Sequence, residues 1–137
     1  MIGFDKKITI YNQWFDPQTK VTSWHKTVVD GASWSGGQRV KVGEGLTSSD
    51  GYSVRIPYKA LESVSSVFLE RDQYVSLEDP EGFYTAQNGD TVILGEGPEV
   101  EKNIAEVTKR FTNCFTVTAV NTSSLLRLLS HLRLEGV

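Results

Sequence analysis

The stretch Tyr52–Tyr58 constrains the fold more than any other part of the chain, because its side chains alternate between apolar and polar. One face of an extended backbone would carry Tyr52, Val54, Ile56 and Tyr58. The opposite face would carry Ser53, Arg55 and Pro57. Alternation with a period of two is typical of a strand with one buried face. Because proline has no backbone N–H, Pro57 limits pairing at its end of the strand or places the strand at a sheet edge.

Other short runs rich in β-branched and aromatic residues predict further strands. These runs are Ile8–Tyr11, Lys20–Trp34, Arg39–Val42, Thr91–Leu94, Cys114–Val120 and Leu132–Glu135. Asp16–Thr19 predicts a turn that joins the first two strands in a hairpin, since Asp bonds its own following backbone and Pro presets φ. Lys20–Trp34 is longer than the usual strand, so we expect a bend or bulge at Asp30–Gly31.

Two further segments are expected to differ from this strand pattern. Pro98–Arg110 predicts a helix, because a proline suits the first turn and apolar residues recur at helical spacing. Its acidic residues lie near the start and its basic residues near the end, which suits the helix dipole. Residues 59–90 are the least regular part and predict a long excursion, which Phe83 and Tyr84 would anchor onto the barrel.

Together these elements predict a mainly β fold, a small β-barrel or sandwich of six or seven strands with one packed α-helix and long loops. Closure into a barrel is favoured because it removes exposed sheet edges. The 137 residues suit a single domain, 1–137, which is long enough to bury its own core.

Composition and charge narrow the classes of function. The formal net charge of −3 argues against a protein that binds nucleic acid through a basic face. With Cys114 as the only cysteine, neither an intrachain disulfide nor a thiolate metal cluster can form. The N-terminal residues carry no signal-peptide pattern, and no apolar run approaches the roughly 18 residues of a membrane span. We therefore expect synthesis in the cytoplasm, unless the protein is exported within a larger particle.

The sequence offers no convincing catalytic, cofactor or metal site. His25 and His131 lack partners at ligand spacing. The glycine pairs at 43–45 and 95–97 match neither the P-loop nor the dinucleotide fingerprint. The acidic side chains between residues 72 and 81 lack the spacing of a calcium loop. We expect no enzymatic activity, no cofactor and no bound metal.

Trp14, Trp24 and Trp34 recur every ten residues, which is compatible with aromatic side chains at a barrel rim. Core packing is the simpler interpretation, and contact with another protein is the alternative.

The order of these motifs resembles small proteins from the head-morphogenesis region of tailed phages and prophages of Gram-positive bacteria, and more distantly the head–tail adaptor, or stopper, family. The resemblance rests on soft strand patterns along most of the chain rather than on an invariant signature. They include Ile8–Tyr11, Thr22–Trp24, Gly31–Trp34, Tyr52–Pro57, Gly89–Gly95, Phe115–Val120 and His131–Gly136. The segments Pro98–Arg110 and Ser124–Ser130 are not part of the family pattern.

The resemblance implies a structural virion protein of the phage neck, a head–tail connector that forms a homo-oligomeric ring below the portal and adaptor. It would be assembled in the host cytoplasm, help to retain packaged DNA and dock the tail. Its partners would be copies of itself, the portal or adaptor, and tail-completion or tail-tube proteins. DNA would pass through the lumen without sequence-specific binding, and no membrane is involved.

The resemblance also implies roles for particular residues. A channel loop would comprise Gly43, Glu44, Gly45, Leu46, Asp50 and Gly51. Glu44 and Asp50 would face the lumen, where acidic side chains repel phosphate and let DNA slide. Inter-subunit contacts would involve Tyr52, Arg55, Pro57, Phe83 and Tyr84. An open edge at the Pro57 strand would be a template for pairing between subunits.

Three alternatives remain open at this point, and one of them is an enzyme, which predicts converging titratable groups around His25 or His131. Another alternative, also structural, is a tail-completion protein, a tail terminator or a minor capsid protein. A further alternative is a small β-barrel that binds a ligand or nucleic acid, which requires a deep pocket or a basic aromatic groove.

Overall fold

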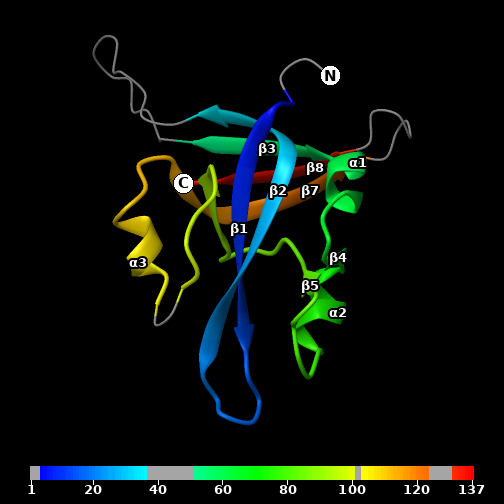
Figure 1. Cartoon of the computed structure of the whole chain (residues 1–137), viewed down its shortest axis with the longest axis vertical. Helices are drawn as coiled ribbons and strands as arrows, with labels where there is room; N and C mark the ends of the chain where they lie inside the picture. Colours follow the sequence, from blue (N-terminus) through cyan, green and yellow to red (C-terminus); the bar gives the residue numbers. More distant parts are fainter. Residues whose placement is uncertain (1–3, 37–50, 101–102, 124–130) are drawn as a thin grey trace.

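The computed structural model describes residues 4–36, 51–100, 103–123 and 131–137, and its fold is mainly β (Figure 1). In chain order the elements are β1 (Lys6–Phe15), β2 (Thr22–Gly36), β3 (Tyr52–Pro57), α1 (Tyr58–Glu62), β4 (Val67–Phe68), α2 (Arg71–Val75), β5 (Phe83–Tyr84), β6 (Thr91–Leu94), α3 (Ala105–Thr108), β7 (Cys114–Ser123) and β8 (His131–Gly136). None of the helices in these ranges is long and apolar enough to cross a membrane.

Six antiparallel strands close into a barrel in the order β1-β2-β3-β8-β7-β6, and β4 and β5 form a separate parallel pair. The expectation of a small β-barrel is confirmed. The predicted strand Arg39–Val42 lies outside the described residues.

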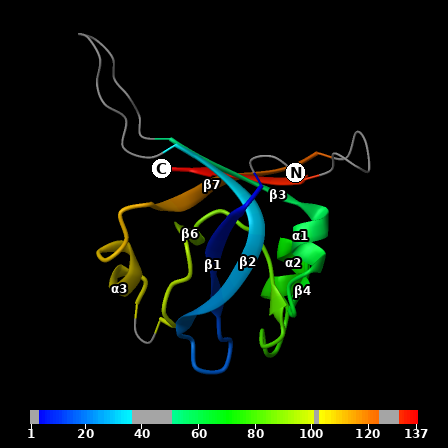
Figure 2. The same ribbon diagram turned by 45° about the horizontal axis from the view of Figure 1, so that its top comes forward.

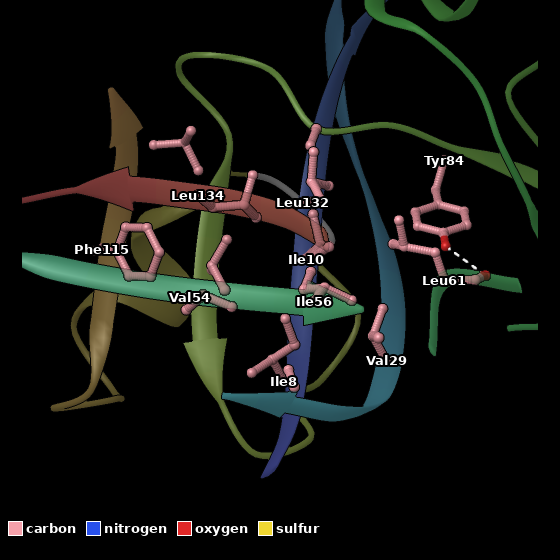
Figure 3. Packing of buried hydrophobic residues seen from close by; sticks show 14 residues of the cluster. Ile8, Ile10, Val29, Val54, Ile56, Leu61, Tyr84, Phe115, Leu132 and Leu134 are labelled. Atoms are coloured by element: carbon pink, nitrogen blue, oxygen red, sulfur yellow. Dashed lines mark hydrogen bonds between the residues drawn. The ribbon is translucent and has the colours of Figure 1, made fainter. Parts of the chain in front are cut away.

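The β3 strand supplies the centre of the core, as its alternation predicts. Val54 and Ile56 are fully buried, whereas Arg55 between them is exposed. They pack with residues from the other barrel strands, including Ile8, Ile10, Val29, Phe115, Leu132 and Leu134 (Figure 3). The core therefore sits inside the barrel, with every barrel strand turning apolar side chains inward.

The expected open edge at β3 is wrong. β3 pairs with β2 along Tyr52–Arg55 and with β8 along its whole length. Pro57 marks the place where pairing with β2 has ended, so its missing N–H costs no hydrogen bond there.

The first two strands form a long ribbon of which only part belongs to the barrel. β1 pairs with β2 along all of its length, but β6 covers only Ile8–Tyr11, and β3 covers only Ser33–Gly36 of β2. The remaining half projects beyond the barrel and ends in the Asp16–Lys20 turn (Figures 1 and 2). The predicted hairpin is confirmed.

The predicted irregularity at Asp30–Gly31 is also confirmed. The register places Lys6 opposite Ala32 and Lys7 opposite Asp30, so Gly31 is an extra residue in β2. Its φ of 97° lies in the region that favours glycine. A bulge of this kind bends the strand, and here it lies between the part of β2 that pairs with β3 and the part that pairs only with β1.

The long helix predicted over Pro98–Arg110 is not observed, because α3 covers only Ala105–Thr108. The side chains of β1 hold the preceding segment against the barrel. Thr9 Oγ1 donates to the Gly95 carbonyl at 2.7 Å, and Tyr11 Oη donates to the Pro98 carbonyl at 2.7 Å. These bonds fix Gly95 and Pro98 against β1 ahead of the helix, and α3 itself is anchored by buried Val107.

Candidate interaction surfaces

A buried polar network lies where β1 leaves the barrel. Asn12 Nδ2 donates to Asp90 Oδ2 and to the Thr85 carbonyl, each at 2.7 Å, and Asn12 Oδ1 accepts from Thr85 N at 3.1 Å. Gln13 N donates to Asp90 Oδ1 at 3.0 Å. Gln87 completes the network by donating its backbone N–H to Asp90 and its side-chain amide to both Asp90 and the Gln13 carbonyl.

Asp90 is the acceptor at the centre of this network and is fully buried. Burial raises the pKa of its carboxyl to about 7, and the hydrogen bonds from Gln13, Asn12 and Gln87 offset part of that rise. Each hydrogen-bond partner of the Asp90 carboxyl is a donor, an arrangement that suits the ionised carboxylate. Asp90 thus joins β1 to the chain that precedes β6 through charge-assisted hydrogen bonds.

The network covers one edge of the projecting ribbon. The backbone N–H of Gln13 is bonded to Asp90 and its carbonyl to Gln87, so two side chains take the place of a neighbouring strand. The covered edge is therefore unable to pair with another chain at this residue.

The opposite edge of the ribbon is open. Gln13 lies directly across from Trp24, and because the backbone of Gln13 points away from β2, that of Trp24 points away from β1. The period of two places the N–H and C=O groups of Lys26 and Val28 on the same side. Within the described ranges no strand pairs with this part of β2. The open edge that the sequence places at β3 therefore belongs to β2.

The tip of the ribbon carries two exposed apolar side chains. Phe15 and Val21 are 56% and 60% exposed and flank the turn, where Asp16 N donates to the Val21 carbonyl at 3.0 Å. The Asp16 carboxylate accepts the Gln18 N–H at 2.9 Å, and this bond lowers its pKa. Lys20 is exposed at the end of the turn. We name Phe15–Val21 the ribbon tip.

The excursion between β3 and β6 is anchored to the barrel by its own aromatic residue. Tyr84 is fully buried, and its hydroxyl donates to the Leu61 carbonyl of α1 at 2.9 Å (Figure 3). Phe68 packs edge-on against Tyr84 with ring centroids 5.2 Å apart. The sequence-based expectation that Tyr84 anchors this excursion fits these contacts.

A surface groove of about 400 Å³ lies on the excursion between α1 and β4. Its lining includes Tyr58, Leu61, Glu62, Val64, Val67 and Phe68. Val67 is 55% exposed although it is aliphatic, and Glu62 is the charged residue of the lining. We name this feature the excursion groove.

The residues expected at inter-subunit contacts fall into different environments. Arg55 is exposed, and Pro57 and Phe83 are half-buried. Tyr52 is half-buried and stacks on Phe115 with ring centroids 5.3 Å apart. The assignment of Tyr84 to an inter-subunit contact is wrong, because the whole side chain is enclosed in the core of its own subunit.

The channel loop expected from the resemblance lies almost entirely outside the described residues. Gly43, Glu44, Gly45, Leu46 and Asp50 are all in the range 37–50. Gly51 alone is described, immediately before β3, and it is half-buried.

The histidine and tryptophan positions have ordinary packing environments. His25 Nε2 shares a hydrogen bond of 2.8 Å with Ser23 Oγ, and its ring lies edge-on to Trp14. Burial lowers the pKa of His25. Trp14 is buried, whereas Trp24 and Trp34 pack partly buried against the two apolar clusters. In the described part of the chain, no three His, Cys, Asp or Glu side chains are grouped to hold a metal ion.

Two features of these surfaces were not identified from the sequence. Phe15 and Val21 bracket the predicted Asp-Pro turn, and apolar residues on both sides of a polar turn were a usable signal. Asp90 reads as a turn residue after Asn88-Gly89, and its burial depends on contacts with β1 almost eighty positions away.

Comparison with known proteins places the chain in a family without assigning it an activity. The sequence profile of a family of unknown function, DUF6751, matches residues 3–137. No curated protein and no solved structure gives a significant match. Since that match extends over nearly the whole sequence, the chain belongs to the DUF6751 family of unknown function.

Proposed function

We propose that the protein is a structural subunit of a tailed-phage neck, a head–tail connector of the stopper type that assembles into a homo-oligomeric ring. The ring lies below the portal and adaptor, helps to retain packaged DNA and docks the tail. The proposal starts from the resemblance of the strand motifs to that family, and it includes no enzymatic activity and no cofactor.

The single observation that carries the proposal is the projecting ribbon. In the described part of the chain no strand pairs with the open edge of β2, and the Phe15 and Val21 side chains are more than half exposed. Exposed edges and apolar side chains of this kind favour contact with another polypeptide. Assembly of subunits would cover them.

The net charge of the chain is compatible with a channel through which DNA passes without being bound. The formal net charge is −3, so the subunit has no overall excess of cations to neutralise phosphates. The resemblance assigns Glu44 and Asp50, which lie outside the described residues, to the lumen of the proposed ring, where their charge would repel the backbone of the passing DNA. The chain then retains DNA by steric closure rather than by affinity.

Electron microscopy of the purified protein tests the proposal. The protein is imaged by negative stain alone and after mixing with the portal–adaptor complex of the phage or prophage that encodes it. We expect closed rings of identical subunits, either free or seated on the portal. A protein that stays monomeric and unbound in both samples contradicts the proposal.

The same experiment distinguishes the stopper role from the alternative role of a tail-completion or terminator protein. The protein is also mixed with isolated tails from that phage. Rings found only at the head-proximal end of the tails, with none on the portal, assign it to the tail rather than to the stopper position.

A further inference from the structure

The ribbon tip has the shape and chemistry of a plug. It projects from the barrel on two paired strands, so it can reach into a neighbouring molecule without moving the core (Figures 1 and 2). Its apolar side chains, Phe15 and Val21, are both more than half exposed. The tip carries two charges: the Asp16 carboxylate accepts the Gln18 N–H of its own turn, and Lys20 at the end of the turn is exposed.

The excursion groove has the complementary chemistry. Its walls include the side chains of Tyr58, Val64 and Phe68, which are half-buried, and the exposed Val67. The one charged residue in its lining is Glu62, which is exposed and acidic. The exposed Phe15 and Val21 match the apolar walls of this groove, and the exposed Lys20 has the charge opposite to that of Glu62.

Plug and groove lie on different elements of the same subunit. The tip joins β1 to β2, whereas the groove is formed by α1, β4 and the chain between them. A contact between two different patches is heterologous, so it leaves one free plug and one free groove after each addition. Repetition of such a contact closes into a ring when the rotation between subunits permits it.

We propose that adjacent subunits are joined by insertion of the ribbon tip of one copy into the excursion groove of the next, with Lys20 paired to Glu62 across the joint. This inference rests on the proposed ring assembly and names its contact. The occupant of the groove is a second copy of this chain.

Charge reversal tests the pairing of Lys20 with Glu62. The variants Lys20→Glu and Glu62→Lys each place like charges at the joint, whereas the combined variant restores opposite charges. Mass photometry of each protein across a concentration series gives the fraction of subunits in the assembled form. We expect each single variant to weaken association at least tenfold and the combined variant to recover most of that loss.

Matched controls come from exposed charges away from the joint. Glu81→Lys and Lys109→Glu have the same size of charge change, on residues that are exposed and do not line the groove. They are expected to leave association unchanged. Circular dichroism of all variants checks that the fold is retained, which is expected because every substituted side chain is exposed.

A mixing experiment gives an independent measurement. Val21→Cys and Val67→Cys are made in separate proteins in which Cys114 is replaced by Ser, and a short bis-maleimide crosslinker is added. A covalent dimer is expected when the two proteins are mixed, and not with either protein alone. Each remaining cysteine then reports on one side of the joint.

The outcomes distinguish the joint from the proposed function. Wild-type rings together with single variants that assemble as well as wild type, or a combined variant no better than the singles, overturn the joint and leave the ring intact. A wild-type protein that never assembles, alone or on the portal, overturns both.

Discussion

Asp90 is the residue through which the projecting ribbon is held to the rest of the barrel. Its carboxylate accepts hydrogen bonds from a β1 side chain, a β1 backbone amide and two groups of Gln87, all in a buried setting. Buried hydrogen bonds to a charged group are among the stronger ones, and removing one partner leaves the others unsatisfied. The same burial raises the pKa of Asp90 to about 7.

This raised pKa predicts a definite dependence of stability on pH. The folded chain binds a proton at Asp90 below about pH 7, whereas the unfolded chain does so only near the ordinary value of 3.8. The Asp90 contribution to the free energy of unfolding is therefore largest below pH 4 and decreases as the pH rises to 7. Urea unfolding at pH 5 and pH 8 should show a loss of about 1–3 kcal/mol towards pH 8 that is absent in Asp90→Asn.

The difference in unfolding free energy between wild type and Asp90→Asn isolates the contribution of Asp90. Burial lowers the pKa of His25, so its stabilising contribution is lost as the pH falls through about 6.5, which opposes the effect of Asp90. His25 is the same in both proteins, so its contribution cancels in the difference between them. Asp72→Asn, at an exposed carboxyl, serves as the control. A pH dependence that is identical in wild type and Asp90→Asn contradicts the prediction.

Two buried tyrosines provide a matched test of the excursion anchor. The Tyr84 hydroxyl donates to the Leu61 carbonyl, whereas the Tyr74 hydroxyl has no hydrogen-bond partner among the described residues. Tyr84→Phe is expected to lower the free energy of unfolding by about 1 kcal/mol, because the carbonyl loses its donor. Tyr74→Phe is expected to cost nothing or to stabilise slightly, since it removes an unpaired buried hydroxyl.

Denaturant unfolding of the two variants measures this difference directly. Both changes remove one oxygen from a fully buried ring, so their packing effects are comparable. Equal losses for Tyr84→Phe and Tyr74→Phe would show that the hydrogen bond to Leu61 does not hold the excursion.

At the scale of elements, the ribbon has two edges of unequal protection. Gln13 and Trp24 face each other across it, but the Gln13 amide is bonded to Asp90, whereas the Trp24 amide points to the open edge. Hydrogen exchange followed by NMR should therefore find slow exchange at Gln13 and fast exchange at Trp24.

The exchange rate of the Trp14 amide shows whether fast exchange at Trp24 reflects an open edge or fraying of the whole ribbon. Trp14 lies opposite Ser23, and in an antiparallel ladder these two residues bond each other's backbone groups, as Asn12 and His25 do. The Trp14 amide should therefore be protected like that of Gln13. Protection of Trp24 and Lys26 in the monomer equal to that of Gln13 is incompatible with an open edge on β2.

The elements that the sequence predicts correctly are those whose signal is local. Alternation identifies β3 and β8, and the Asp-Pro turn and Asp30–Gly31 identify the hairpin and its bulge. The helix predicted over Pro98–Arg110 is observed only as Ala105–Thr108, and the chain before it is tied to β1, almost ninety residues away, through the Gly95 and Pro98 carbonyls, which no local pattern reveals. The open edge is assigned to the wrong strand for the same reason, since a single strand pattern does not reveal its neighbours.

For the whole molecule, barrel closure follows from many short strands with one buried face each, and this was predictable. The interaction surfaces were harder to predict from the sequence. Tyr84 has the composition of a contact residue but is in the core, whereas Phe15 and Val21 look like ordinary strand residues and are exposed. Burial is decided by the tertiary arrangement, so aromatic character alone does not separate anchor from surface.

The proposed assembly predicts a concentration-dependent melting temperature. Association of folded subunits stabilises them relative to unfolded chains, and the effect grows with subunit concentration. Scanning calorimetry over a hundredfold range of concentration should show a rising transition temperature for wild type and a smaller rise for Lys20→Glu. A transition temperature independent of concentration in both proteins indicates that the subunits act as monomers.

The inequality of the two ribbon edges also bears on misassembly. A two-stranded ribbon with both sides free can recruit chain after chain, and an endless fibril is the usual result. With Asp90 and Gln87 occupying the polar backbone groups of Gln13, extension by this route stops after one incoming strand. A high concentration of newly made subunits would then lead to finite particles instead of insoluble polymer.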